Sequence, residues 1–100
     1  MALCDITEYD KLARDASGAI IQTGGEPAAV QQQVAVAGAS AQSAAFSLAT
    51  RFVRVHSDVP TRILFGANPT AVATSMRIAA GATEYFGVIP GQKIAVILTT

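Results

Sequence analysis

Short apolar runs separated by turns dominate the second half of the chain, and they constrain its fold more than any other feature. These runs are rich in β-branched and aromatic residues, which favour strands. Glycine, proline, aspartate and asparagine residues separate them, at a spacing of roughly 8–12 residues that is typical of antiparallel sandwiches and barrels. We therefore expect an all-β fold. The runs are "TRFVRVHS", "TRILFG", "ATSMRIA", "TEYFGVI" and "KIAVILT".

The last run is apolar at almost every position, although the chain ends there. Successive side chains of a strand point to opposite faces, so Ile94 and Val96 lie on one face and Ala95 and Ile97 on the other. Apolar residues on both faces predict a strand that is covered on both sides. Pro90-Gly91 supplies a tight reversal, so we expect "TEYFGVI" and "KIAVILT" to pair as a hairpin.

The stretch from Pro27 to Thr50 is rich in alanine and less clear. Alanine is the best helix former, which leaves a helix as an alternative in this stretch. The stretch lacks a helical apolar stripe, however, and "QQVAVA" alternates with a period of two. We therefore predict two short strands, at about 31–37 and 43–48, joined by a turn of small residues.

The N-terminal region is polar and punctuated by glycines, and it predicts little regular structure of its own. We interpret residues 1–30 as a partly extended arm, with a single helical turn near Tyr9 as an alternative. Residues 31–100 then form the folded domain. The expected fold is a small antiparallel β-sandwich, jelly-roll or Ig-like, of about 6–8 short strands with this N-terminal arm.

The charge pattern favours packing against other proteins over binding to nucleic acid. Charged residues make up 14% of the chain and the formal net charge is zero, whereas a typical soluble domain has about 25% charged residues. Residues 1–26 carry a net charge of −3 and residues 51–100 a net charge of +3. An acidic segment of this kind could dock on a basic surface of its own or a neighbouring subunit, or be scattered solvated charge. We expect a homo-oligomer and no nucleic-acid partner.

The sequence offers no constellation of catalytic residues. His56 is the only histidine, Cys4 is the only cysteine, and the acidic residues are spread singly. We therefore expect no enzymatic activity, no catalytic or cofactor-binding residues and no metal site. No apolar stretch approaches the roughly 20 residues of a membrane-spanning helix. The start "MALCDITEYD" is acidic where a signal peptide needs basic residues, so we expect synthesis in the cytoplasm and no membrane partner.

Two stretches carry a family resemblance. Phe65-Gly66-Ala67-Asn68-Pro69-Thr70 and Glu84-Tyr85-Phe86-Gly87-Val88, followed by Pro90-Gly91, resemble a recurrent family of small virion proteins of tailed bacteriophages. The N-terminal "ITEYDKLARDASG" and "GGEPA" are also similar to that family, so the resemblance covers nearly the whole chain. Many such proteins have a proline before the Glu-Tyr pair, where this chain has Thr83.

The resemblance implies a non-enzymatic structural role in the virion, first as a capsid decoration or cement protein that binds and stabilises the head shell. The major capsid protein or other virion proteins would be its partners. The alternatives are a head–tail connector or tail component, and a host- or carbohydrate-binding β-sandwich module. Exposed termini and sheet edges suit such contacts. The residues that we predict at the assembly interface are Glu8, Tyr9, Asp10, Arg14, Asn68 and Tyr85.

Overall fold

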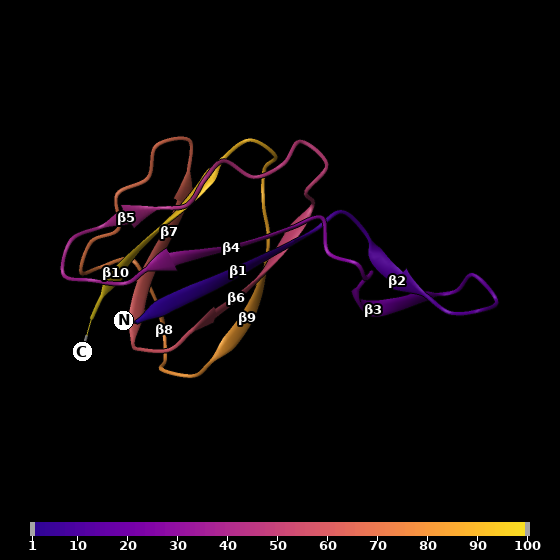
Figure 1. Cartoon of the computed structure of the whole chain (residues 1–100), viewed down its shortest axis with the longest axis horizontal. Coiled ribbons are helices and arrows are strands. Elements are labelled where there is room, and N and C mark those ends of the chain that lie inside the picture. Colours follow the sequence, from indigo (N-terminus) through magenta and orange to yellow (C-terminus); the bar gives the residue numbers. More distant parts are fainter. Residues whose placement is uncertain (1, 100) are drawn as a thin grey trace.

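The computed structural model describes residues 2–99, which form ten short strands and no helix (Figure 1). This confirms the predicted all-β fold, with more strands than expected. The strands are β1 (Leu3–Tyr9), β2 (Leu12–Arg14), β3 (Ile20–Gly24), β4 (Val30–Ala35), β5 (Ala41–Gln42), β6 (Phe52–Ser57), β7 (Thr61–Gly66), β8 (Met76–Ile78), β9 (Thr83–Gly87) and β10 (Lys93–Leu98).

Eight of these strands form two four-stranded antiparallel sheets, in the orders β4-β1-β6-β9 and β5-β10-β7-β8. One apolar core joins them, because buried side chains from both sheets form a single cluster. The first sheet contributes Ile6 and Val53, and the second contributes Ile63 and Ile94. The fold is therefore a small β-sandwich, and strands β2 and β3 form a separate hairpin outside it.

Alternation along the strands decides which side chains enter this core. In β6, Val53 and Val55 are fully buried, whereas Arg54 and His56, which alternate with them, are partly exposed on the outer face. In β10, Ile94 and Val96 enter the core, and Ala95 on the opposite face is also fully buried. The prediction that the last strand is covered on both sides is thus confirmed around Ala95.

The predicted arm over residues 1–30 is wrong in its first part. Strand β1 lies inside the first sheet, paired with β4 on one side and β6 on the other. Its Cys4 and Ile6 are fully buried, while the polar Asp5 and Thr7 between them lie on the outer face. The polar residues in this stretch belong to a half-buried strand, so the sandwich begins at Leu3 and not at residue 31.

The predicted hairpin between the last two runs is also wrong. Strand β9 pairs with β6 in the first sheet, whereas β10 pairs with β7 and β5 in the second. The Pro90-Gly91 turn therefore carries the chain from one sheet to the other. A tight turn permits pairing of the flanking strands, but here the core between the sheets separates them.

The two strands predicted in the alanine-rich stretch are half correct. The first is present as β4, but the second, at 43–48, is absent from the described residues, and only Ala41–Gln42 pair as β5. The segment that follows continues as a loop beside the start of β10. Its backbone amides at Ser43 and Phe46 donate to the carbonyls of Ile94 and Gln92. These amides are therefore hydrogen-bonded although the segment is not a strand of the sheet.

Replacement of Ile94 by alanine tests the placement of the last strand. Because Ile94 is fully buried in the core, Ile94→Ala should lower the free energy of unfolding by about 2–5 kcal/mol. Ile89 has 62% of its surface exposed, so Ile89→Ala should change it by no more than about 0.5 kcal/mol. Urea unfolding of both variants measures the difference, and equal effects would contradict the register of β10.

Candidate functional site

The β2–β3 hairpin projects from one end of the sandwich (Figure 1). Its turn is well built, since Asp15 Oδ1 accepts hydrogen bonds from the Ser17 hydroxyl, the Ser17 amide and the Ala19 amide. These hydrogen bonds hold the pKa of Asp15 below its ordinary value, and the bond from the Ser17 hydroxyl contributes most. Gly18 closes the turn at φ +87°, a conformation that favours glycine. The hairpin is therefore an ordered element although it makes no sheet with the rest of the chain.

Tyr9 joins the hairpin to the sandwich. Its hydroxyl donates a 2.6 Å hydrogen bond to Glu26 Oε2, which raises the pKa of Tyr9. Its ring stacks on Phe52, with 5.2 Å between the ring centroids. Gly24 lies directly against the same ring, where a Cβ would be only 2.5 Å from Tyr9 Cε1. Any side chain at Gly24 would therefore push the hairpin away from the sheet.

The outer face of the first sheet carries three rows of side chains across its strands, set by the strand register. The row nearest the hairpin contains Tyr9, Phe52 and Gly87. The next two rows are more polar, and apart from the ring of Tyr85 they carry amide, hydroxyl, imidazole and charged groups. The second row is Gln31, Thr7, Arg54 and Tyr85, and the third is Gln33, Asp5, His56 and Thr83.

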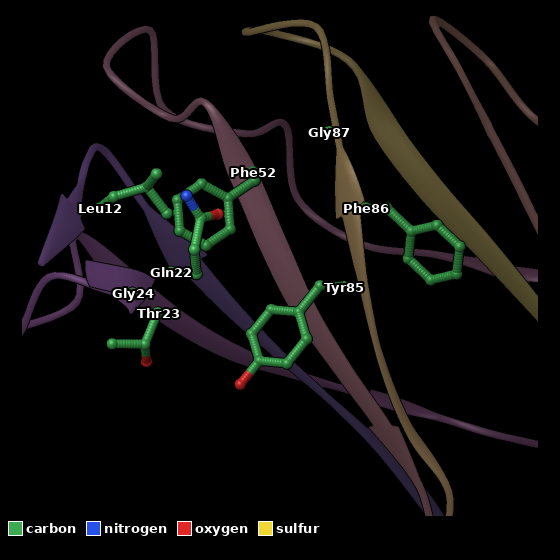
Figure 2. A pocket seen from close by; sticks show the side chains of 8 residues that line it. All are labelled: Leu12, Gln22, Thr23, Gly24, Phe52, Tyr85, Phe86 and Gly87. Atoms are coloured by element: carbon green, nitrogen blue, oxygen red, sulfur yellow. The ribbon is translucent and has the colours of Figure 1, made fainter. Parts of the chain in front are cut away.

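A hollow of about 410 Å³ lies between the hairpin and the outer face of β6 and β9 (Figure 2). Tyr85 borders it with 56% of its surface exposed. Gln22 and Thr23 line it from the hairpin, whereas the Phe86 side chain points away and packs on Phe65 in the core. The hollow thus combines an exposed aromatic ring with neutral polar groups.

Exposed apolar side chains lie on the hairpin and on two loops at the hairpin end of the sandwich, and others (Leu64, Val72, Met76 and Leu98) lie on or beside the second sheet. Ile20 and Ile21 on the hairpin are 55% and 43% exposed, and Leu48 and Ile89 on two loops are 81% and 62% exposed. The loop with Leu48 leads into β6 and the loop with Ile89 follows β9, at the strand ends beside Tyr9. Leu48 also lies near Gly91 of the second loop, since a Cβ there would be 3.9 Å from Leu48 Cδ2.

Glu8 was predicted at an assembly interface, and the structure contradicts this. Its side chain is fully buried. One carboxylate oxygen accepts hydrogen bonds from the Thr50 hydroxyl at 2.7 Å and the Ser47 amide at 2.9 Å. The other oxygen accepts from Gln32 Nε2 at 2.9 Å. A buried carboxylate is stable only when it is hydrogen-bonded in this way, so Glu8 holds the fold together and is not available to a partner.

The other predicted interface residues are divided between two faces. Asp10 and Arg14 are exposed at the hairpin, where Arg14 Nη1 donates to the Gly18 carbonyl. Tyr85 borders the hollow, and Tyr9 is buried beneath the hairpin. Asn68 accepts from Gln42 on the second sheet, so the structure does not bring it together with the others.

Cys4 and His56 do not form a reactive pair. Burial, followed by the charges of Asp5 and Asp58, raises the pKa of the Cys4 thiol to about 12. His56 Nδ1 lies 2.8 Å from Thr83 Oγ1, and its Nε2 lies 3.9 Å from Asp58 Oδ1. Across residues 2–99, no three His, Cys, Asp or Glu side chains come together in a way that could hold a metal ion. The same residues include no helix long and apolar enough to cross a membrane.

Apart from Tyr85, the residues that line the hollow could not have been found from the sequence. Gln22 and Thr23 line the same hollow as Tyr85 only because the hairpin folds against β6 and β9. The close approach of Gly24 to the Tyr9 ring likewise depends on the tertiary structure.

Comparison of the chain with protein-family models, with curated proteins and with solved structures found no match.

Removal of the Glu8 charge tests the role of this buried carboxylate. All three of its partners donate hydrogen bonds, so the amide of Glu8→Gln would place a donor against a donor. We expect a loss of about 1–3 kcal/mol in the free energy of unfolding. Glu84→Gln is the matched control, because Glu84 is exposed, and it should change stability by no more than about 0.5 kcal/mol. If Glu8→Gln unfolds in urea as the control does, the carboxylate has no such role.

Proposed function

We propose that this chain is a non-enzymatic structural protein of a tailed-bacteriophage virion, a capsid decoration or cement protein that binds the head shell through protein–protein contacts. The observation that carries the proposal is the group of exposed apolar side chains on the projecting hairpin and the two loops beside it. These are Ile20, Ile21, Leu48 and Ile89. A patch of exposed apolar residues on a soluble domain is typical of an interaction surface.

The construction of the hairpin supports this role. A two-stranded hairpin is marginally stable by itself in water, yet here Asp15 orders its turn and Tyr9 fixes its base. An element that is already ordered loses little conformational entropy when it docks on a partner. A rigid projection with apolar side chains therefore suits permanent attachment to a neighbouring protein.

The sequence supports the same role. The resemblance to small virion proteins covers nearly the whole chain, and its most specific stretches are Phe65–Thr70 and Glu84–Val88. The low fraction of charged residues suits a subunit that is packed against others. A head–tail connector or tail component is the second candidate, and it would use the same surface at a much lower copy number.

Copy number in the particle distinguishes these two candidates. We expect quantitative mass spectrometry of purified particles of the encoding phage to find this chain at a level close to that of the major capsid protein. A few copies per particle would favour the connector or tail component. Absence of the chain from purified particles would overturn the virion role.

Loss of the two hairpin isoleucines should weaken attachment without unfolding the chain. Ile20 and Ile21 are exposed, so the double variant Ile20→Ser/Ile21→Ser should keep its melting temperature. Burial of each isoleucine at an interface is worth about 1.5–3 kcal/mol, so binding to particles prepared without the protein should fall at least about tenfold. Val72→Ser removes an exposed apolar side chain on a different loop and serves as the control in a co-sedimentation assay. Equal binding of the double variant and the control would contradict the hairpin as the attachment surface.

A further inference from the structure

We infer that the hollow between the hairpin and the first sheet is a binding site for a neutral saccharide, with Tyr85 as the ring on which a sugar stacks. This goes beyond the proposed attachment to a shell and does not depend on it. Its volume of about 410 Å³ falls within the range of about 300–1,000 Å³ that is usual for ligand pockets. The space suits a sugar unit and not a folded partner.

Tyr85 presents a flat apolar surface to the hollow (Figure 2). More than half of its surface, 56%, is exposed. Its ring centroid lies 6.5 Å from that of Phe52, which in turn stacks on Tyr9. This series of rings holds Tyr85 in place. The C–H face of a pyranose ring is apolar, and a fixed aromatic ring is a suitable surface for it.

The polar groups of the hollow match the rim of a sugar ring. Gln22 offers an amide with two donors and one acceptor oxygen, and Thr23 offers a hydroxyl that donates and accepts. Both side chains are exposed and belong to residues that line the hollow, where Gln22 extends toward Phe52 and Thr23 lies farther from Tyr85 (Figure 2). Sugar hydroxyls also donate and accept, so each can pair with either of these side chains.

The charge of the hollow selects a neutral ligand. Every residue that lines it is uncharged, so a charged ligand would find no ionic partner within the hollow itself. The guanidinium group of Arg54, the register partner of Tyr85, belongs to the adjoining hollow. Thr7, Arg54 and Gln31 continue the surface along the row that contains Tyr85. The hydroxyl, guanidinium and amide groups of these three residues border a second, more polar hollow on the same face. A longer saccharide could therefore extend across the sheet from the unit that stacks on Tyr85.

Gly87 provides a separate indication that this space is kept open. Its backbone is outside the left-handed region, and a Cβ built on it would meet nothing within 4 Å. Neither backbone conformation nor packing therefore requires a glycine at the end of β9. Gly87 borders the hollow opposite Phe52, where a larger side chain would occupy the space. A glycine in a strand often marks a position where a ligand approaches closely.

Nuclear magnetic resonance of the full chain labelled with ¹⁵N tests the site. The probes are maltotriose, cellotriose, N-acetyllactosamine and chitotriose, each added to millimolar concentration. We expect at least one of them to shift the amide signals of residues 22–24, 52 and 85–87 in a saturable way. Failure of all four to shift these signals, or shifts confined to other parts of the chain, would overturn the proposal.

Variants of the two residues that carry the argument separate binding from folding. Tyr85→Ala should weaken binding of the active probe at least about tenfold, whereas Tyr85→Phe keeps the ring and should retain most of the affinity. Gly87→Val fills the hollow and should abolish the shifts at an unchanged melting temperature. Gly38→Val is the matched control, because a Cβ at Gly38 also meets nothing within 4 Å. Gly38 lies in the loop between β4 and β5 and does not line the hollow. Unimpaired binding by both Tyr85→Ala and Gly87→Val would place the ligand outside the hollow.

Discussion

The buried carboxylate of Glu8 is the interaction on which the rest of the structure depends. It accepts hydrogen bonds from Gln32 on the neighbouring strand and from Ser47 and Thr50 in the loop before β6. The same loop also donates from the Ser43 amide to Ile94 of β10 and from the Phe46 amide to Gln92 just before β10. One side chain thereby links strand β1 to its edge neighbour and to the segment that closes the end of the sandwich. The charge is tolerated there because these bonds replace its lost hydration.

The alternation of β1 places the functional surface directly behind this anchor. Glu8 points into the core and the next residue, Tyr9, points to the outer face. Tyr9 holds the hairpin through Glu26 and supports the ring of Phe52, which contacts Tyr85. A disturbance of the strand at Glu8 would therefore reach the hairpin and the hollow as well as the core.

The proposed shell contact and the proposed saccharide site use different properties of the same end of the molecule. Attachment would depend on exposed aliphatic side chains such as Ile20 and Leu48, whose burial releases water. Saccharide binding would depend on Tyr85 and on neutral polar groups around a concave space. A subunit with both could be fixed to a particle and still present a ligand site, provided that the hollow faces outward after assembly.

The all-β class and most of the strand positions can be predicted from the sequence, because β-branched residues alternate along runs such as Phe52–Ser57 and turn residues separate them. The pairing of the strands, the core position of β1, the burial of Glu8 and the position of Tyr85 beside a hollow became evident only in the folded chain. Alternation is a local property and can be read along the chain, whereas pairing and burial depend on contacts between distant residues, whose energies decide among many compatible arrangements.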